Sequence, residues 1–131
     1  MQRTPINPWD WSQGLGYHQG LLVHGPARTL YCAGQTATDA QGQPQHPGDM
    51  AAQLALCLDN LEAVLRQAEM TLADLVKLTI HTTDVDTLLR HYGVLAGRLG
   101  AAGAAPPATL LGAARLALPG LLVELEGIAA A

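Results

Sequence analysis

Phenylalanine is absent from the 131-residue chain, and aromatic residues of all kinds make up only 4% of it. Charged residues are also scarce, at 14%, whereas apolar residues reach 49%. A chain this apolar and this weakly charged is not typical of a disordered protein. Because much of its apolar content is Ala and Leu, we expect a core of small side chains and an apolar surface that another subunit covers.

Clusters of Lys and Arg are also missing. The chain has 7 Lys and Arg against 11 Asp and Glu, which gives a net charge of −4. A nucleic-acid interface needs concentrated positive charge, so we predict no nucleic-acid partner. No apolar run reaches the length of a membrane span, and the start, residues 1–5, lacks the apolar core of a signal peptide. We therefore expect a cytoplasmic protein with no membrane partner.

Metal and redox motifs are not found either. Cys32 and Cys57 have no metal-binding or redox spacing, and we expect two buried free thiols, with a disulfide as the alternative. The histidines show no metal-ligand spacing, so we predict neither a metal nor a cofactor; they are His18, His24, His46, His81 and His91.

The first third of the chain predicts strands. Two prolines and two tryptophans before residue 12 indicate an irregular segment or a short edge strand. Leu21–Val23 and Thr29–Gln35 flank a five-residue connection with Gly25 and Pro26, which predicts a β-hairpin. Residues 39–48 are rich in Gly and Pro and predict a loop.

Two helical segments follow. Asp49 is a suitable N-cap for a helix to about Ala68, whose apolar stripe is Leu54, Leu58, Leu61, Leu65 and Ala68. Thr71–Asp74 is typical of a second capped turn. We predict a second helix from near Asp84 to Leu99.

The remaining segments predict three more strands. Between the helices, Val76, Leu78 and Ile80 alternate with Lys77, Thr79 and His81, which is the period of a half-buried strand. Two strands, residues 108–116 and 121–129, close the chain. We thus expect one α+β domain over residues 1–131, in the order β-β-α-β-α-β-β. Its two helices cover one face of the sheet, and we expect other copies to cover the second face, which also carries apolar residues.

Six short motifs, in this order and spacing, resemble the RidA family, also called YjgF or endoribonuclease L-PSP. They are Gly16-Tyr17-His18-Gln19, Tyr31-Cys32-Ala33-Gly34-Gln35, Leu58-Asp59-Asn60-Leu61, Thr82-Thr83-Asp84, Pro106-Pro107-Ala108-Thr109 with the later Ala114-Arg115-Leu116, and Glu124-Leu125-Glu126. The resemblance implies a fold like that of the small trimeric chorismate mutases, and a homotrimer with clefts between its subunits.

The resemblance also implies a site. In the family, water adds to a protonated imine and ammonia is lost, with a glutamate orienting the water; Glu124 matches that catalytic glutamate. The matched substrate-binding positions are Tyr17, Gly34, Ala108 and Thr109. Ala108 stands where the best-known members carry an arginine that pairs with the substrate carboxylate, whereas Thr109 keeps a hydroxyl.

Each matched residue also has a structural interpretation. Tyr17 is slightly more often a packed aromatic than a ligand-binding phenol. Gly34 indicates a close approach of backbone to a ligand or a neighbouring chain. Glu124 and Glu126 project from the same face of one strand, and solvated or ion-paired carboxylates are the alternative. Cys32 is a better candidate for an inert buried thiol than for a cleft residue.

No other arginine is an evident substitute for the missing one. Arg115 lies on the predicted strand of Ala108 but points to its opposite face, and we expect a structural role for it. Arg28 lies in the predicted hairpin turn and is expected to be solvated. His18, next to the matched tyrosine, is suited to acid–base chemistry, and an ordinary surface histidine is the alternative interpretation.

The sequence therefore favours a small-molecule enzyme that hydrolyses an imine or enamine other than a standard 2-imino acid. The alternative is a non-catalytic, small-molecule-binding trimer. The acidic balance of the chain disfavours ribonuclease activity, a third possibility that the older family name suggests.

Overall fold

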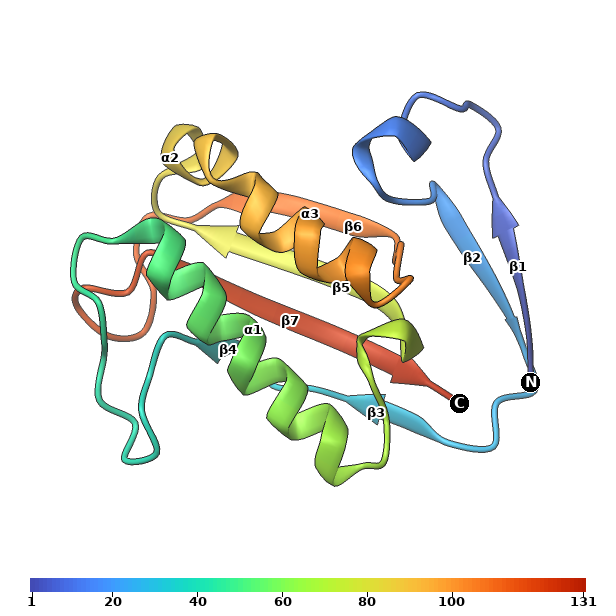
Figure 1. The fold of residues 1–131 in the computed structure, drawn as a ribbon, viewed down its shortest axis with the longest axis horizontal. Helices are drawn as coiled ribbons and strands as arrows, with labels where there is room; N and C mark the ends of the chain where they lie inside the picture. The colour runs from blue at the N-terminus through green and yellow to red at the C-terminus, as the bar shows by residue number, and fades with distance from the viewer.

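A five-stranded mixed sheet with helices on one face forms the body of the computed structural model, which describes all of residues 1–131 (Figure 1). The strands run in the order β3-β7-β5-β6, and β4 pairs with β7 next to β3. Only β5 and β6 are parallel. The bounds are Thr29–Tyr31 for β3, Gln35–Thr36 for β4, Leu75–Thr82 for β5, Ala108–Gly112 for β6 and Val123–Ala130 for β7.

Helix α1, Met50–Gln67, confirms the first predicted helix. The Asp49 carboxylate accepts a hydrogen bond from the backbone N–H of Ala52 at 3.0 Å, as an N-cap should. The predicted stripe packs the helix across β7. Its four leucines, Leu54, Leu58, Leu61 and Leu65, are fully buried, whereas Ala68, at the C-cap, is only half-buried. The period of 3.6 residues thus sets which side of α1 faces the sheet.

Strand β5 confirms the predicted alternation from Lys77 onward. The prediction is wrong at Val76, which is only half-buried; the strand pairing is irregular between Leu75 and Lys77, and Leu75 is buried instead. Leu78, Ile80 and Thr82 are buried on the helix side, whereas Lys77, Thr79 and His81 are only half-buried on the other side. The short 3-10 helix η2, Leu72–Asp74, precedes β5 and begins at the predicted capped turn. There Thr71 and Asp74 form a reciprocal capping box.

The predicted hairpin of Leu21–Val23 with Thr29–Gln35 is wrong. Strand β2, Gly20–His24, pairs instead with β1, Gln2–Ile6, so the N-terminal segment is an edge strand. A 3-10 turn, η1 (Gln13–Leu15), lies in their connection. In Figure 1 this pair of strands stands apart from the main sheet.

Longer-range pairing explains this outcome. Strand β3 pairs with β7, because the eight-residue β7 offers it a free edge, and Arg28 and Ala131 extend that ladder with two backbone hydrogen bonds. The Arg3 side chain links β1 to the body through the Ala73 carbonyl at 2.7 Å and the Asp74 carboxylate at 3.2 Å. The five paired positions of β1 take the place of the predicted hairpin partner.

The second predicted helix is interrupted. It consists of α2, Val85–Arg90, and α3, Tyr92–Ala101, because the hydrogen bonds around His91 run to the residue three positions earlier and tighten the chain there. Both segments still pack on the same face as α1 (Figure 1). The helical segment begins near Asp84, as predicted, and the Asp84 carboxylate caps α2 by accepting a hydrogen bond from the N–H of Thr87 at 3.1 Å.

Strand β6 ends at Gly112, four residues before the predicted end, because its partner β5 ends at Thr82 and leaves nothing to pair with. The observed order is therefore β-β-β-β-α-β-α-α-β-β, with two more strands and one more helix than predicted. The α+β class, with helices on one face of a mixed sheet, is confirmed. None of the helices combines the length and the apolar character that crossing a membrane requires.

Asn60 on α1 generates the first testable prediction. Its side-chain amide donates to the carbonyls of Thr36 at 2.9 Å and Thr38 at 3.0 Å, and so holds β4 against the helix. We expect Asn60→Ala to lower the free energy of unfolding by about 2 kcal/mol, since two partly buried carbonyls lose their donor. Urea denaturation measures the change.

The matched control is Gln67→Ala, at the exposed end of the same helix, where a change within about 0.5 kcal/mol is expected. Equal effects of the two substitutions would contradict the role given to Asn60.

Candidate functional site

The face of the five-stranded sheet that no helix covers, here called the open face, carries most of the candidate site. Its composition follows from strand β7. Val123, Leu125 and Ala129 are buried against the helices, so the alternating residues Glu124 and Glu126 must point to the open face. Ile128 lies on the open face as well.

Neighbouring strands extend the open face, since residues paired across strands share a face. Most side chains on the open face are polar. The prediction that this face also carries apolar residues is confirmed at three positions. The polar members are Thr36, Lys77, Thr79, His81, Thr109, Glu124 and Glu126, and the apolar or aromatic members are Tyr31, Leu111 and Ile128. Tyr31 is 76% exposed and Leu111 47% exposed, which leaves both available to another copy of the chain.

Glu124 lies directly over the backbone of Gly34. A Cβ added at Gly34 would lie 2.0 Å from Glu124 Oε1, so no side chain fits there while the carboxylate keeps its position. The close approach predicted at Gly34 is therefore made to the Glu124 side chain of the same chain. The carboxylate itself is half-buried and has no hydrogen-bond donor or ion-pair partner within the chain. It is free to accept a hydrogen bond from water, a ligand or a neighbouring subunit.

His81 is the residue paired directly with Glu124 on β5, and Thr36 is paired with it on β4. Side chains at such positions lie about 5 Å apart at Cβ. An imidazole beside a carboxylate is a common acid–base pair. His81 was not among the predicted site residues, because alternation places it on the open face but the sequence gives no register between β5 and β7.

Ala108 and Thr109 point to opposite faces of β6. Ala108 packs against the core on the helix side, whereas Thr109 lies on the open face and accepts a hydrogen bond from Lys77 Nζ at 2.7 Å. Lys77 has no carboxylate partner. Lys77, which was not among the predicted site residues, therefore places a positive charge beside Thr109. It lies on the open face, whereas an arginine side chain at position 108 would start on the helix side.

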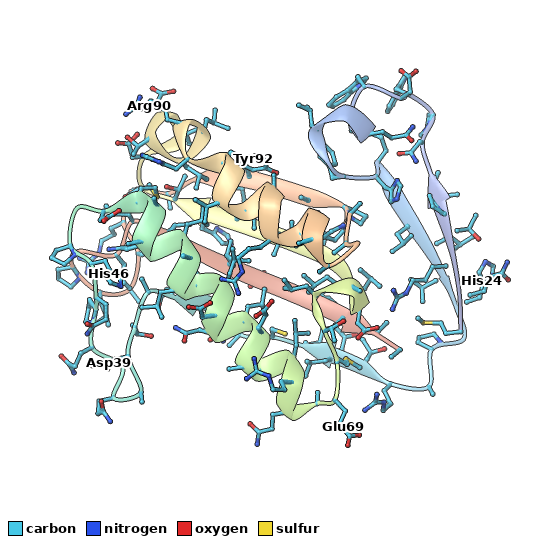
Figure 2. All side chains as sticks on the ribbon, in the orientation of Figure 1. His24, Asp39, His46, Glu69, Arg90 and Tyr92 are labelled. Atoms are coloured by element: carbon cyan, nitrogen blue, oxygen red, sulfur yellow. The ribbon has the colours of Figure 1, made fainter.

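Tyr17 lies on the helix side of the sheet, in the connection between β1 and β2. Its ring meets that of Trp11 edge to face, with 6.1 Å between centroids. It lines a cavity of about 300 Å³ together with Leu15, Leu89, Tyr92 and Leu110; Figure 2 labels Tyr92 at the start of α3. Within one chain, the structure does not bring Tyr17 to the open face, where Glu124 and Thr109 lie.

The other residues singled out in the sequence lie apart from Glu124. His18 Nδ1 is 3.1 Å from Asn7 Nδ2, within the β1–β2 unit. Arg115 follows the end of β6, is exposed and has no acidic partner, so the prediction that it shares a strand with Ala108 is wrong. Arg28 is exposed, and its guanidinium also donates to the Ala68 carbonyl at 2.8 Å, which satisfies an acceptor at the end of α1. Glu126 is exposed and has no ion pair, as the solvated alternative predicts.

Both cysteines are buried and free in this structure, which removes the disulfide alternative. Burial raises the pKa of Cys57 to about 12, and the nearby charge of Glu124 adds to the effect. Burial also raises the pKa of Cys32. No three side chains of the His, Cys, Asp and Glu types lie close enough together to hold a metal ion.

The close contact between Gly34 and Glu124 predicts that substitutions at these two residues have non-additive effects on stability. Gly34→Ala must displace the Glu124 carboxylate, and an off-rotamer side chain costs about 1 kcal/mol. We expect this loss in the otherwise unchanged protein, measured by urea denaturation. In a Glu124→Ala background the same substitution should cost almost nothing, since the displaced group is gone. Equal costs in both backgrounds would show that the contact with Glu124 is not what requires glycine.

The raised thiol pKa values predict chemical inertness. Because the thiolate is the reactive form, neither Cys32 nor Cys57 should react quickly with an aromatic disulfide reagent in the folded protein between pH 7 and 9. Two equivalents should react once urea unfolds the chain. Rapid labelling of the native protein, followed by absorbance, would contradict the burial described above.

The sequence and the fold were compared with those of known proteins. The sequence profile of the family described as Endoribonuclease L-PSP matches residues 15–131. Protein mmf2, mitochondrial, of Schizosaccharomyces pombe is 32% identical over 130 residues, which cover 99% of each chain. The Rid-family protein YyfB of Yersinia pestis, described as of unknown function, superposes with a TM-score of 0.85 at 34% identity over the whole of both chains. Escherichia coli TdcF with bound serine superposes with a TM-score of 0.71 at 26% identity, covering 88% of this chain and 87% of its own.

The profile match spans most of the chain, and the relatives at 32% and 34% identity align with nearly all of it. Together with the α+β fold, these matches confirm the resemblance seen in the six motifs. The chain is a member of the Rid family, also called YjgF or endoribonuclease L-PSP.

Proposed function

We propose that the chain assembles as a homotrimer with clefts between its subunits and hydrolyses a small imine or enamine that is not a standard 2-imino acid. The observation that carries the proposal is the Glu124 carboxylate, half-buried, without a donor of its own and paired across the sheet with His81. The proposal treats residues 1–131 as one domain and places it in the cytosol, where its two free thiols stay reduced. The word mitochondrial in the name of mmf2 describes that protein.

Hydrolysis of an imine requires a group that orients a water molecule and a group that transfers protons. A water molecule adds to the carbon of a protonated imine, a proton moves to nitrogen, and ammonia leaves as the carbonyl forms. Glu124 is suited to accept a hydrogen bond from the attacking water and so to orient it. His81 is placed to exchange protons with the water or with the departing nitrogen, since an imidazole ring can donate a proton from one nitrogen and accept one at the other.

The trimer supplies what one chain lacks. Tyr17 and Glu124 lie on different sides of the sheet, so a cleft that includes both needs residues from two chains. Uncovered apolar side chains of the N-terminal segment support such an assembly; they are Ile6, Trp9, Trp11, Leu15 and Leu22. In this arrangement Tyr17, Gly34, Ala108 and Thr109 form the substrate-binding part of the cleft, and Glu124 the catalytic part.

Ala108 is the reason for proposing a substrate other than a 2-imino acid. The serine bound by TdcF carries a carboxylate, and a desolvated carboxylate without a guanidinium loses a pair of charge-assisted hydrogen bonds. The methyl group of Ala108 cannot provide them. The same residue favours the second candidate, a trimer that binds a small molecule without turning it over.

Hydrolysis of freshly generated 2-iminopropanoate tests the proposal. We expect slow turnover by the unmodified protein, at least about tenfold faster turnover by Ala108→Arg, and a loss of at least about a hundredfold in Glu124→Gln. Glu126→Gln is the matched control, because it lies on the same strand and the same face but is exposed and away from Gly34.

Equal rates in Glu124→Gln and Glu126→Gln would contradict the catalytic role of Glu124. Silence of the unmodified protein and of Ala108→Arg, in preparations that are folded and assembled, would favour the binding trimer over the enzyme.

A further inference from the structure

The cavity beside Tyr17 is apolar throughout. Its volume of about 300 Å³ is lined by the hydrophobic side chains Leu15, Tyr17, Leu89, Tyr92 and Leu110, and no charged residue contributes to it. Three separate parts of the chain meet there: the β1–β2 connection, the helices α2 and α3, and the edge strand β6. This size falls at the lower end of small-molecule sites, which are mostly apolar with a few polar groups.

Strand β6 connects the cavity to the position of the missing arginine. Ala108 and Leu110 are two residues apart and both pack on the helix side of the strand, so the side chain at position 108 points to the same side as the cavity wall. An arginine there would bring a fixed positive charge next to the cavity. With Ala108, an anion entering this space would lose its hydration and find no cation in return.

Among the side chains that line the cavity, only those of Tyr17 and Tyr92 carry polar atoms. Burial and the neighbouring Tyr17 raise the pKa of Tyr92, which keeps the Tyr92 phenol protonated at pH 7. Neither hydroxyl makes a hydrogen bond within the chain, and the Tyr17 ring is held by Trp11. A neutral donor or acceptor is therefore what these hydroxyls can recognise.

From these contacts we propose that the cavity binds the uncharged aromatic or branched aliphatic part of a small molecule, with one neutral polar group hydrogen-bonded to Tyr17 or Tyr92. This inference rests on the proposed function, and it names the substrate class for that site: an imine or enamine of an apolar aldehyde or ketone that lacks a carboxylate. The missing arginine and the apolar lining then follow from one requirement, since both exclude anions.

A pair of probes that differ in charge tests the inference without turnover. Phenylacetamide and phenylacetate have the same ring and nearly the same size. We expect the full-length protein to bind phenylacetamide at least about tenfold more tightly than phenylacetate, followed by Trp fluorescence and by saturation-transfer NMR of the probes. Leu89→Trp should weaken phenylacetamide binding at least about tenfold, because the larger side chain fills the cavity from its rim, where Leu89 is 55% exposed.

Leu118→Trp is the matched control, since Leu118 is also an exposed leucine, at 41%, but lies outside the cavity. Its affinity for phenylacetamide should equal that of the unmodified protein. Circular dichroism and light scattering of both variants establish that fold and assembly are retained.

Three results would overturn the inference. They are equal or tighter binding of phenylacetate, no binding of phenylacetamide by the unmodified protein, and dissociation of the assembly by Leu89→Trp, which would make the cavity a contact between copies. If the protein binds phenylacetamide but no variant hydrolyses an imine, the binding inference stands and the proposed enzymatic function is contradicted. Hydrolysis that depends on Glu124 but no selective binding would do the opposite, so the two proposals fail separately.

Discussion

Burial of one side of strand β7 against helix α1 decides where the polar side chains of the candidate site point. Val123, Leu125 and Ala129 enter the core. A Cβ at Gly127 would lie 2.8 Å from a methyl group of Leu75 on β5 and 3.5 Å from one of Leu61 on α1, so the neighbouring strand and helix pack close to β7 at this point. A shift by one residue would bury two carboxylates, which costs several kcal/mol or more, and would expose the apolar positions. Core packing thus holds Glu124 on the open face.

Two further residues, Asn60 and Gly34, determine the surroundings of Glu124. Asn60 fixes β4 at the free edge of β7, and the chain between β3 and β4 passes under the Glu124 carboxylate at Gly34. The result is a half-buried carboxylate that the chain itself does not satisfy. Half-buried charged groups usually find partners, so this one indicates where water, a ligand or another subunit belongs. The proposed function rests on this Glu124 carboxylate, which has no hydrogen-bond donor within the chain.

Local patterns predicted local structure well. The cap at Asp49, the leucine stripe of α1 and the alternation along β5 from Lys77 onward depend on neighbours a few residues away, and all three are confirmed. Long-range pairing was not predictable in the same way. The pairing of β2 with β1 and the early end of β6 depend on which distant strand offers a free edge, and no local signal encodes that.

The same division holds for the site. Glu124 and Tyr17 were identified through the family resemblance, and no residue pattern alone singled them out. The neighbours of the site, Lys77 beside Thr109 and His81 beside Glu124, emerge only from the strand register. Their alternation predicted the face but not the partners. The apolar cavity next to Tyr17 likewise depends on three segments that meet only in the folded chain.

In the proposed trimer, other copies of the chain cover the open face, so that one site is shared between subunits. Multi-angle light scattering coupled to size-exclusion chromatography tests it most directly, with Leu111→Asp on the open face and Leu118→Asp outside it as a matched pair of exposed leucines. The account predicts three times the mass of one chain for the unmodified protein and for Leu118→Asp, and a smaller species for Leu111→Asp. A single-chain mass for the unmodified protein at micromolar concentration would contradict it.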